Sequence, residues 1–116
     1  MNRKELSDEL EVIVNEWALS QNELSILIMQ DTILSTGIAD WVEFLQSSHV
    51  EYLCQIISIK DLIHILYPAE RWPTYIRAPN RYFDGKSAMD VMLADPITGV
   101  TMVHKYLQAS VQGGYF

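Results

Sequence analysis

The chain has 116 residues and a formal net charge of −7, which is the size of one ordinary domain. Its composition, 49% hydrophobic and 20% charged, excludes an intrinsically disordered chain. The apolar runs are far shorter than the roughly 18 residues that a membrane span needs, and the first residues lack the apolar core of a signal peptide. A single cysteine, Cys54, excludes an internal disulfide and a cysteine-rich metal site. We therefore expect a soluble, cytoplasmic protein.

The charge is distributed unevenly between the two halves of the chain. Residues 1–58 carry a net charge of −8, whereas residues 59–116 carry +1. Four of the six basic residues of the second half lie between Arg71 and Lys86. A strongly acidic half is poorly suited to neutralising phosphates. The charge pattern therefore favours a protein partner over a nucleic acid.

Helical periodicity begins near the N-terminus. Apolar residues recur at spacings of three and four, which places them on one face of a first helix: Leu6, Leu10, Ile13, Val14 and Trp17. The sequence Ser20-Gln-Asn-Glu23 is a capping box and predicts the start of a second, short helix. Asp31-Thr32 is the next expected helix start, and Gly37 weakens that helix.

A long apolar helix is expected in the middle of the chain. Ser48-His-Val-Glu51 has the form of a second capping box, and the apolar segment that follows runs to Tyr67, where Pro68 ends it. A short helical piece over residues 70–76 leads into an irregular loop that ends with the turn signal Asp84-Gly85.

The last third is expected to hold two helices. Ser87-Ala-Met-Asp90 resembles a capping box, and Asp95-Pro96 places a cap before a proline at the first helical position. The final helix is expected to end at Gly113-Gly114. The side chains expected to point inward from it are Val100, Val103, Leu107 and Val111. No strand alternation persists, so we predict an all-α, compact multi-helix domain in which regions 1–46 and 47–116 share one core.

The sequence offers no constellation for catalysis. His49, His64 and His104 are scattered, without the spacing of metal ligands. Cys54 lies in the densely apolar helix, where an inert thiol is expected. No glycine-rich phosphate loop is present. We expect no catalytic residue, no metal site and no cofactor, and hence a protein that is not an enzyme.

One segment is unusual for a helical protein. It places Trp72, Pro79-Asn80, Gly85 and Ser87 in quick succession before a short apolar helix. A set of residues at regular steps then completes the pattern: Gly99, Val103, Leu107 and Gly113. Over residues 48–116 this resembles the toxin-binding domain of the Xre/MbcA/ParS antitoxins, whose pattern runs W-x-x-x-P-N, G-x-[ST]-P, a short apolar helix, and then G, V, L and a late G.

The chain departs from that pattern at three places. Trp72 stands further ahead of Pro79-Asn80 than is usual in the family. Ala88 occupies the position of the proline that usually follows Ser/Thr, although Ser87 can still cap the helix. Ser110 occupies a position that is normally apolar, and we expect Val111 to substitute for it in the core.

The resemblance implies a function. It implies the antitoxin of a type II toxin–antitoxin pair, whose partner is a RES-domain toxin that consumes NAD or ADP-ribosylates a target. Inhibition would be stoichiometric occlusion, as a homodimer or a hetero-oligomer with the toxin, and the antitoxin would need no cofactor. A dimeric adaptor without a toxin is an alternative.

The family also implies toxin contacts in the matched segment and the tail. Trp72, Tyr75 and Phe83 are either interface anchors or core residues beside the central helix, and for Trp72 the two interpretations have equal weight. Arg77 and Arg81 either meet acids of a partner or are solvated loop residues. Pro79 and Asn80 are expected to shape the loop, with Asn80 bonded to nearby backbone. The tail is either frayed or a probe for the toxin's active-site cleft. The tail residues are Gly113, Gly114, Tyr115 and Phe116.

Family members often carry a helix-turn-helix upstream, and residues 19–27 look like the first helix of such a unit. Met29 stands where the tight turn usually has glycine, and the segment that follows lacks basic residues. With a net charge of −8 over residues 1–58, we expect a degenerate unit that serves packing or dimerisation. The alternative is a repressor of its own operon, with DNA contacts at Gln21, Thr32 and Ser35.

Overall fold

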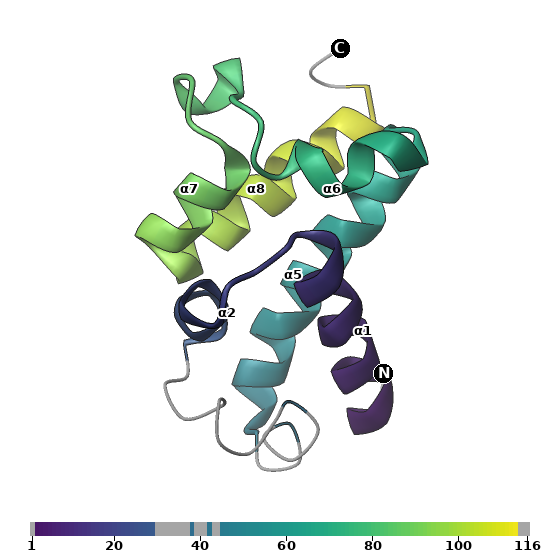
Figure 1. Ribbon diagram of the computed structural model, residues 1–116, viewed down its shortest axis with the longest axis vertical. Coiled ribbons are helices and arrows are strands. Elements are labelled where there is room, and N and C mark those ends of the chain that lie inside the picture. The colour runs from purple at the N-terminus through teal and green to yellow at the C-terminus, as the bar shows by residue number, and fades with distance from the viewer. Residues whose placement is uncertain (1, 30–37, 39–41, 43–44, 114–116) are drawn as a thin grey trace.

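The computed structural model of the chain describes residues 2–29, 38, 42 and 45–113 and confirms the all-α prediction. Helix α5 runs through the centre, and α1 lies along one side of it (Figure 1). Helices α7 and α8 pack together, and α8 also packs on α5. The described elements are α1 (Arg3–Glu16), α2 (Gln21–Ile28), α5 (Ser47–Leu66), the 3-10 turn η1 (Ala69–Arg71), α6 (Trp72–Tyr75), the 3-10 turn η2 (Arg81–Phe83), α7 (Ala88–Ala94) and α8 (Pro96–Val111).

Helix α1 packs on α5 through the apolar face that the sequence predicts. Leu6, Leu10 and Ile13 are at most 2% exposed, and each contributes about 1.5–3 kcal/mol by leaving water. Glu9 of α1 pairs with the buried Lys60 of α5, which also pairs with Asp61 at 3.0 Å. Burial alone lowers the pKa of Lys60, but the hydrogen bonds to the two carboxylates outweigh it and leave the pKa raised. Lys60 is therefore a charged, paired link between the two helices.

Helix α2 begins with the predicted capping box. Ser20 Oγ accepts from the Glu23 amide at 3.1 Å, and the Glu23 side chain accepts from the Ser20 amide at 3.0 Å. At the other end, Met29 adopts the left-handed conformation (φ 59°), so the turn forms without glycine. The third helix expected from Asp31 lies outside the described residues, except that Ile38 and the fully buried Val42 join the core.

The predicted start of the central helix is wrong. Helix α5 begins at Ser47, after Gln46 in an extended conformation, so Ser48 lies inside the first turn and caps nothing. This start places His49 and Tyr52, three residues apart, on the face towards α2. His49 Nε2 lies 2.8 Å from the Ile28 carbonyl oxygen, and the Tyr52 hydroxyl donates to the Leu27 carbonyl. These side chains satisfy terminal carbonyls of α2 that the helix itself leaves without a partner.

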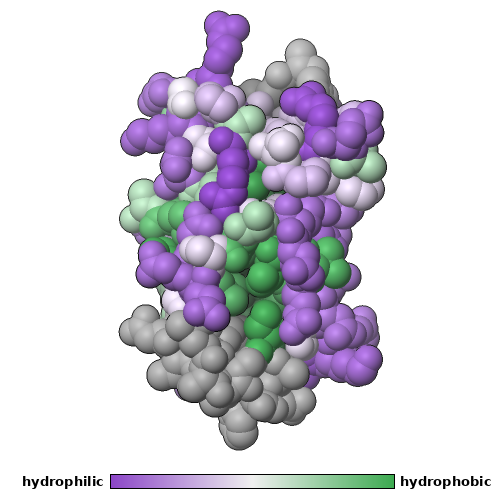
Figure 2. Space-filling view, viewed as in Figure 1, coloured by the Kyte–Doolittle hydropathy of each residue, from purple (hydrophilic) through white to green (hydrophobic). Residues whose placement is uncertain are grey.

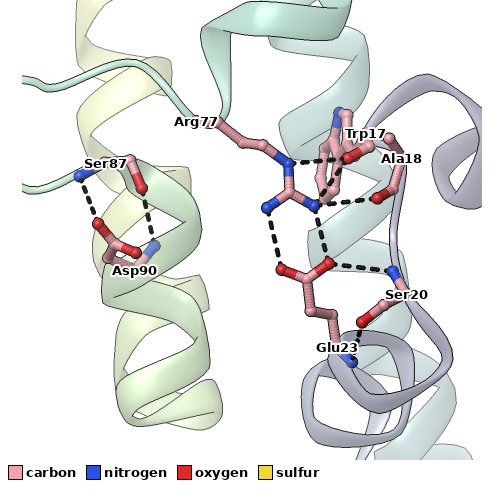
Figure 3. Close-up of polar contacts among 7 residues, drawn as sticks. All are labelled: Trp17, Ala18, Ser20, Glu23, Arg77, Ser87 and Asp90. Atoms are coloured by element: carbon pink, nitrogen blue, oxygen red, sulfur yellow. Dashed lines mark hydrogen bonds and ion pairs between the residues drawn. The ribbon is translucent and has the colours of Figure 1, made fainter.

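Helices α7 and α8 form a closely packed pair. Ser87 and Asp90 cap α7 with the predicted reciprocal bonds, at 3.0 and 3.2 Å (Figure 3). Asp95 holds the cap position before Pro96, but its side chain accepts no capping hydrogen bond. The buried Gly99 makes the close packing possible, because a Cβ there would lie 2.3 Å from the Val91 carbonyl oxygen.

The expectation that Val111 replaces Ser110 in the core is wrong. Ser110 is 4% exposed, whereas Val111 is 42% exposed. Ser110 continues the face of Val103 and Leu107 at helical spacing, and Val111 lies about 100° further around. The serine hydroxyl is satisfied because it donates to the Tyr106 carbonyl at 2.9 Å.

Helices α1 and α2 precede residue 47, but both pack on later helices. Helix α1 contacts α5, and α2 contacts α7 and α8. One continuous cluster of buried side chains includes residues from all of these elements.

Candidate functional site

The loop between α6 and α7 is organised around Asn80. The side-chain oxygen of Asn80 accepts from the Tyr82 backbone amide at 2.8 Å. The backbone carbonyl of Asn80 accepts from the backbone amides of Phe83 and Gly85 at 3.0 and 2.9 Å. The backbone amide of Asn80 donates to the Lys86 carbonyl at 3.1 Å, beside the bridge between Pro79 and Ser87. Asn80 therefore binds nearby backbone, as predicted from the sequence, and holds both ends of the loop together.

The tip of the loop reverses direction through two left-handed residues, Asp84 (φ 57°) and Gly85 (φ 85°). Just before them, Phe83 is 6% exposed and meets the ring of Tyr106 edge-on at 5.4 Å between centroids. Phe83 is thus a core residue that ties the loop to α8. Of the two interpretations of Phe83, the structure shows packing inside the chain.

Arg77 is occupied by partners within the chain, an arrangement that we call the Arg77 clamp. Its guanidinium faces both carboxylate oxygens of Glu23 at 2.9 Å (Figure 3). It also donates to the Trp17 carbonyl at 3.0 and 3.1 Å and to the Ala18 carbonyl at 3.1 Å. Hydrogen bonds from Arg77, followed by the Ser20 amide, lower the pKa of Glu23 to about 2. Arg77 therefore joins the start of the loop to the corner between α1 and α2.

Trp72 is also engaged within the chain. Its ring stacks on His64 at 3.7 Å between centroids, and its indole nitrogen donates to the Tyr67 carbonyl at 2.8 Å. His64 in turn lies 2.8 Å from a carboxylate oxygen of Glu16 in α1. Trp72 is half-buried and holds the short α6 against α5.

An open groove of about 610 Å³ lies where η1, α6, the Asn80 loop and α8 meet. We call it the tyrosine groove. It is lined by four tyrosines (Tyr67, Tyr75, Tyr82, Tyr106), two arginines (Arg71, Arg81) and the turn Ala78–Asn80.

The tyrosines form two stacked pairs. Tyr67 and Tyr75 lie 4.7 Å apart between ring centroids, and Tyr82 and Tyr106 lie 4.4 Å apart. The guanidinium of Arg71 stands over the Tyr67 ring at 4.8 Å. Aromatic rings held by stacking present a large contact surface at little further cost in side-chain entropy.

The groove could be predicted from the sequence only in part. Of the candidate contact residues, Tyr75, Pro79, Asn80 and Arg81 line the groove, whereas Trp72, Arg77 and Phe83 are engaged within the chain. The candidates did not include Tyr67, Arg71, Tyr82 and Tyr106. Tyr67 and Tyr106 are distant in sequence and meet here because α5 packs on α8. Helical periodicity gives a weak indication that Tyr106 is not a core residue, since it lies off the face that carries Val103 and Leu107.

The other predicted contact residues lie elsewhere. Gln21 is exposed in the first turn of α2, and Gly113 is exposed in the left-handed conformation (φ 83°) after α8. The remaining candidates fall outside the described residues: Thr32, Ser35, Gly114, Tyr115 and Phe116.

The described ranges contain no group of three or more His, Cys, Asp or Glu side chains that could hold a metal ion. Nor does any helix within them have the length and apolar character needed to cross a membrane.

Figure 2 shows apolar side chains in the middle of one face, next to residues drawn in grey. A second pocket, lined by residues of α5 and α8 and by Met29 and Leu45, also borders the undescribed segment. Both features therefore carry no functional argument.

Comparison with known proteins assigns no function. No protein-family model matches the chain. The uncharacterized protein y4oB of Sinorhizobium fredii is 41% identical over 71 residues, which are 60% of this chain and 54% of that protein. The chain thus spans about half the length of this relative. No solved structure matches.

Proposed function

We propose that this chain is the antitoxin of a type II toxin–antitoxin pair and that it inhibits a RES-domain toxin by binding to it. The observation that carries the proposal is the tyrosine groove, which is built largely by the segment that resembles the toxin-binding domain of the Xre/MbcA/ParS antitoxins. Tyrosine and arginine are the side chains that protein interfaces favour.

The bonding of the segment supports a role in recognition. The Asn80 hydrogen bonds and the Arg77 clamp fix the backbone on either side of the groove. A preorganised surface loses little conformational entropy when a partner docks. Inhibition by occlusion needs no catalytic group in the antitoxin, and it would proceed with the protein in the cytoplasm beside its toxin.

The experiment is co-expression with a RES-domain protein encoded beside this gene. We expect the two chains to purify as one complex, and toxin-dependent loss of NAD to stop when the antitoxin reaches the stoichiometry of that complex. A matched pair of charge reversals locates the surface: Arg81→Glu should weaken inhibition, and Lys4→Glu, on exposed α1 surface outside the groove, should not. Unchanged NAD loss at saturating antitoxin would refute the proposal.

The tail is a separate part of the proposal. If Tyr115 and Phe116 enter the toxin's cleft, deletion of residues 114–116 should restore toxin activity while leaving the complex intact. Equal neutralisation by the truncated chain would show that the groove surface suffices and that the tail is not the inhibitor.

The repressor alternative rests on one observation, the left-handed turn at Met29 after α2. Helix α2 contains no Lys or Arg, and its Glu23 is paired with Arg77. A DNA reader normally presents several cations to the phosphates. Tight binding of the isolated chain to its own promoter, with a steep dependence on salt, would favour the repressor over the antitoxin.

A further inference from the structure

The lining of the tyrosine groove carries one sign of charge. Arg71 and Arg81 line it, and none of its nine lining residues is acidic. Neither guanidinium forms an ion pair within the described part of the chain. In a protein with a net charge of −7, this is a local concentration of unpaired positive charge. Such a surface attracts an anionic group.

The two arginines belong to different elements, η1 and η2. A guanidinium binds a carboxylate through two parallel hydrogen bonds. Two separate guanidinium groups therefore suit a segment with two or more acidic side chains better than the single carboxylate of a chain terminus. The stacked tyrosine pairs add flat apolar surface for an aromatic or aliphatic side chain of the same segment.

The groove also contains a polar group without a partner. Tyr75 is 7% exposed, and its hydroxyl makes no hydrogen bond among the described residues, although the side chains of Tyr67 and Asn80 lie near it. Burial raises the pKa of Tyr75, so the hydroxyl stays protonated at neutral pH. A buried donor without an acceptor is costly, but the hydroxyl is closed to solvent, so a ligand in the groove would reach it only if the side chains around it moved.

We propose that the tyrosine groove binds an acidic segment of the partner protein, with side-chain carboxylates on Arg71 and Arg81 and an apolar or aromatic side chain against the tyrosines. The inference deepens the proposed function, on which it rests for the identity of the partner. A nucleic acid is a poorer occupant, because its phosphates continue beyond the groove and meet an acidic molecule.

The test is a selection of short random peptides displayed on phage against the full chain, followed by fluorescence polarisation with the enriched peptides. We expect enrichment of sequences that combine Asp or Glu with an aromatic residue. Replacing their acids by Asn and Gln, or using the Arg81→Glu protein, should raise Kd by about ten-fold or more. The Lys4→Glu protein is the matched control and should bind like the wild type.

Three outcomes would overturn the inference: no enrichment, enriched peptides without acidic residues, or equal binding by the wild type and the folded Arg81→Glu protein. Displacement of the peptide by a single-stranded oligonucleotide at comparable concentration would also contradict it. A RES-domain toxin that does not bind, beside acidic peptides that do, would refute the proposed function and leave the groove specificity intact. A toxin that binds the wild type and the Arg81→Glu protein equally well would refute the groove specificity and leave the proposed function intact.

Discussion

The Arg77 clamp and the tyrosine groove place two arginines, four residues apart in sequence, in opposite roles. Arg77 forms hydrogen bonds to two backbone carbonyls and to Glu23, whereas Arg81 is exposed on the groove without an ion pair among the described residues. Both side chains are guanidinium groups of one loop segment. What distinguishes them is the opposing surface: the corner between α1 and α2 offers carbonyl and carboxylate acceptors to Arg77, whereas no residue that lines the groove is acidic.

The difference shows how one short segment combines a bonded backbone with an exposed charge. The clamp and the Asn80 hydrogen bonds stabilise the backbone, while Arg71 and Arg81 stay exposed at the groove. We therefore expect substitutions in the clamp to lower stability, and substitutions in the groove to lower binding with little effect on stability. The following variants test this division.

The largest effect is expected beneath both regions, at the contact between α7 and α8. Gly99→Ala places a Cβ against the Val91 carbonyl oxygen and forces the helices apart, which should lower the free energy of unfolding by about 3 kcal/mol. Urea denaturation followed by circular dichroism measures this loss. Thr98→Ala, at an exposed position of the same helix, is the control and should change little. Equal stability of the Gly99→Ala protein would mean that the helices are not packed this closely.

The clamp comes next. Arg77→Ala leaves the Trp17 and Ala18 carbonyls and Glu23 without their donor and should cost about 2 kcal/mol of unfolding free energy. Arg81→Ala should change stability by less than about 0.5 kcal/mol, since exposed charges without a defined partner contribute little. Denaturation midpoints of both proteins give the comparison directly. Similar losses of unfolding free energy in Arg77→Ala and Arg81→Ala would contradict the division between a stabilising clamp and an exposed groove residue.

The clamp also predicts a dependence on pH. The pKa of Glu23 is lowered from 4.5 to about 2 in the folded chain, chiefly by the hydrogen bonds from Arg77. A lowered pKa means that the stabilisation is complete above the unfolded pKa and is lost as the pH falls through the folded one. The stability advantage of the wild type over Glu23→Gln should therefore be greatest near neutral pH and shrink between pH 4.5 and pH 2. A constant difference across that range would show that Glu23 is not paired as described.

The smallest effect concerns the backbone that the clamp holds. Ala18 adopts a left-handed conformation (φ 51°) while its carbonyl accepts from Arg77. Glycine reaches that conformation without the Cβ penalty, so Ala18→Gly should raise the unfolding free energy by about 0.5 kcal/mol. Thermal denaturation detects the change, and Asn15→Gly, within helix α1, should be destabilising. A loss of stability in Ala18→Gly would contradict the left-handed geometry.

Much of the scaffold could be predicted from local sequence signals. The Ser20 and Ser87 capping boxes, the end of α5 before Pro68 and the role of Asn80 all follow from residues a few positions apart. Ser48 does not cap α5 because the helix starts one residue earlier, at Ser47. His49 and Tyr52 of this first part of α5 contact the end of α2, and such long-range contacts cannot be read from the local sequence. Ser110 replaces Val111 in the core because the exact helical phase decides between neighbouring residues.

The groove was harder to predict because it depends on distant parts of the chain. The partner of Arg77 is Glu23, 54 residues away, and nothing in the local sequence separates Arg77 from Arg81. Tyr67 and Tyr106 become neighbours of the Asn80 loop only when α5 and α8 pack. The irregular loop and the bonding of Asn80 could be predicted from the sequence, but which arginine of the segment is held within the chain and which is exposed could not.

Calorimetric titration of the RES-domain toxin proposed as the partner, with the wild type, Arg81→Glu and Lys4→Glu, tests the role of the groove most directly. If the groove binds the toxin, Arg81→Glu should raise Kd by about ten-fold or more, about 1.4 kcal/mol, and Lys4→Glu should bind like the wild type. Equal affinities for all three folded proteins would contradict the assignment of the tyrosine groove as the surface that binds the toxin.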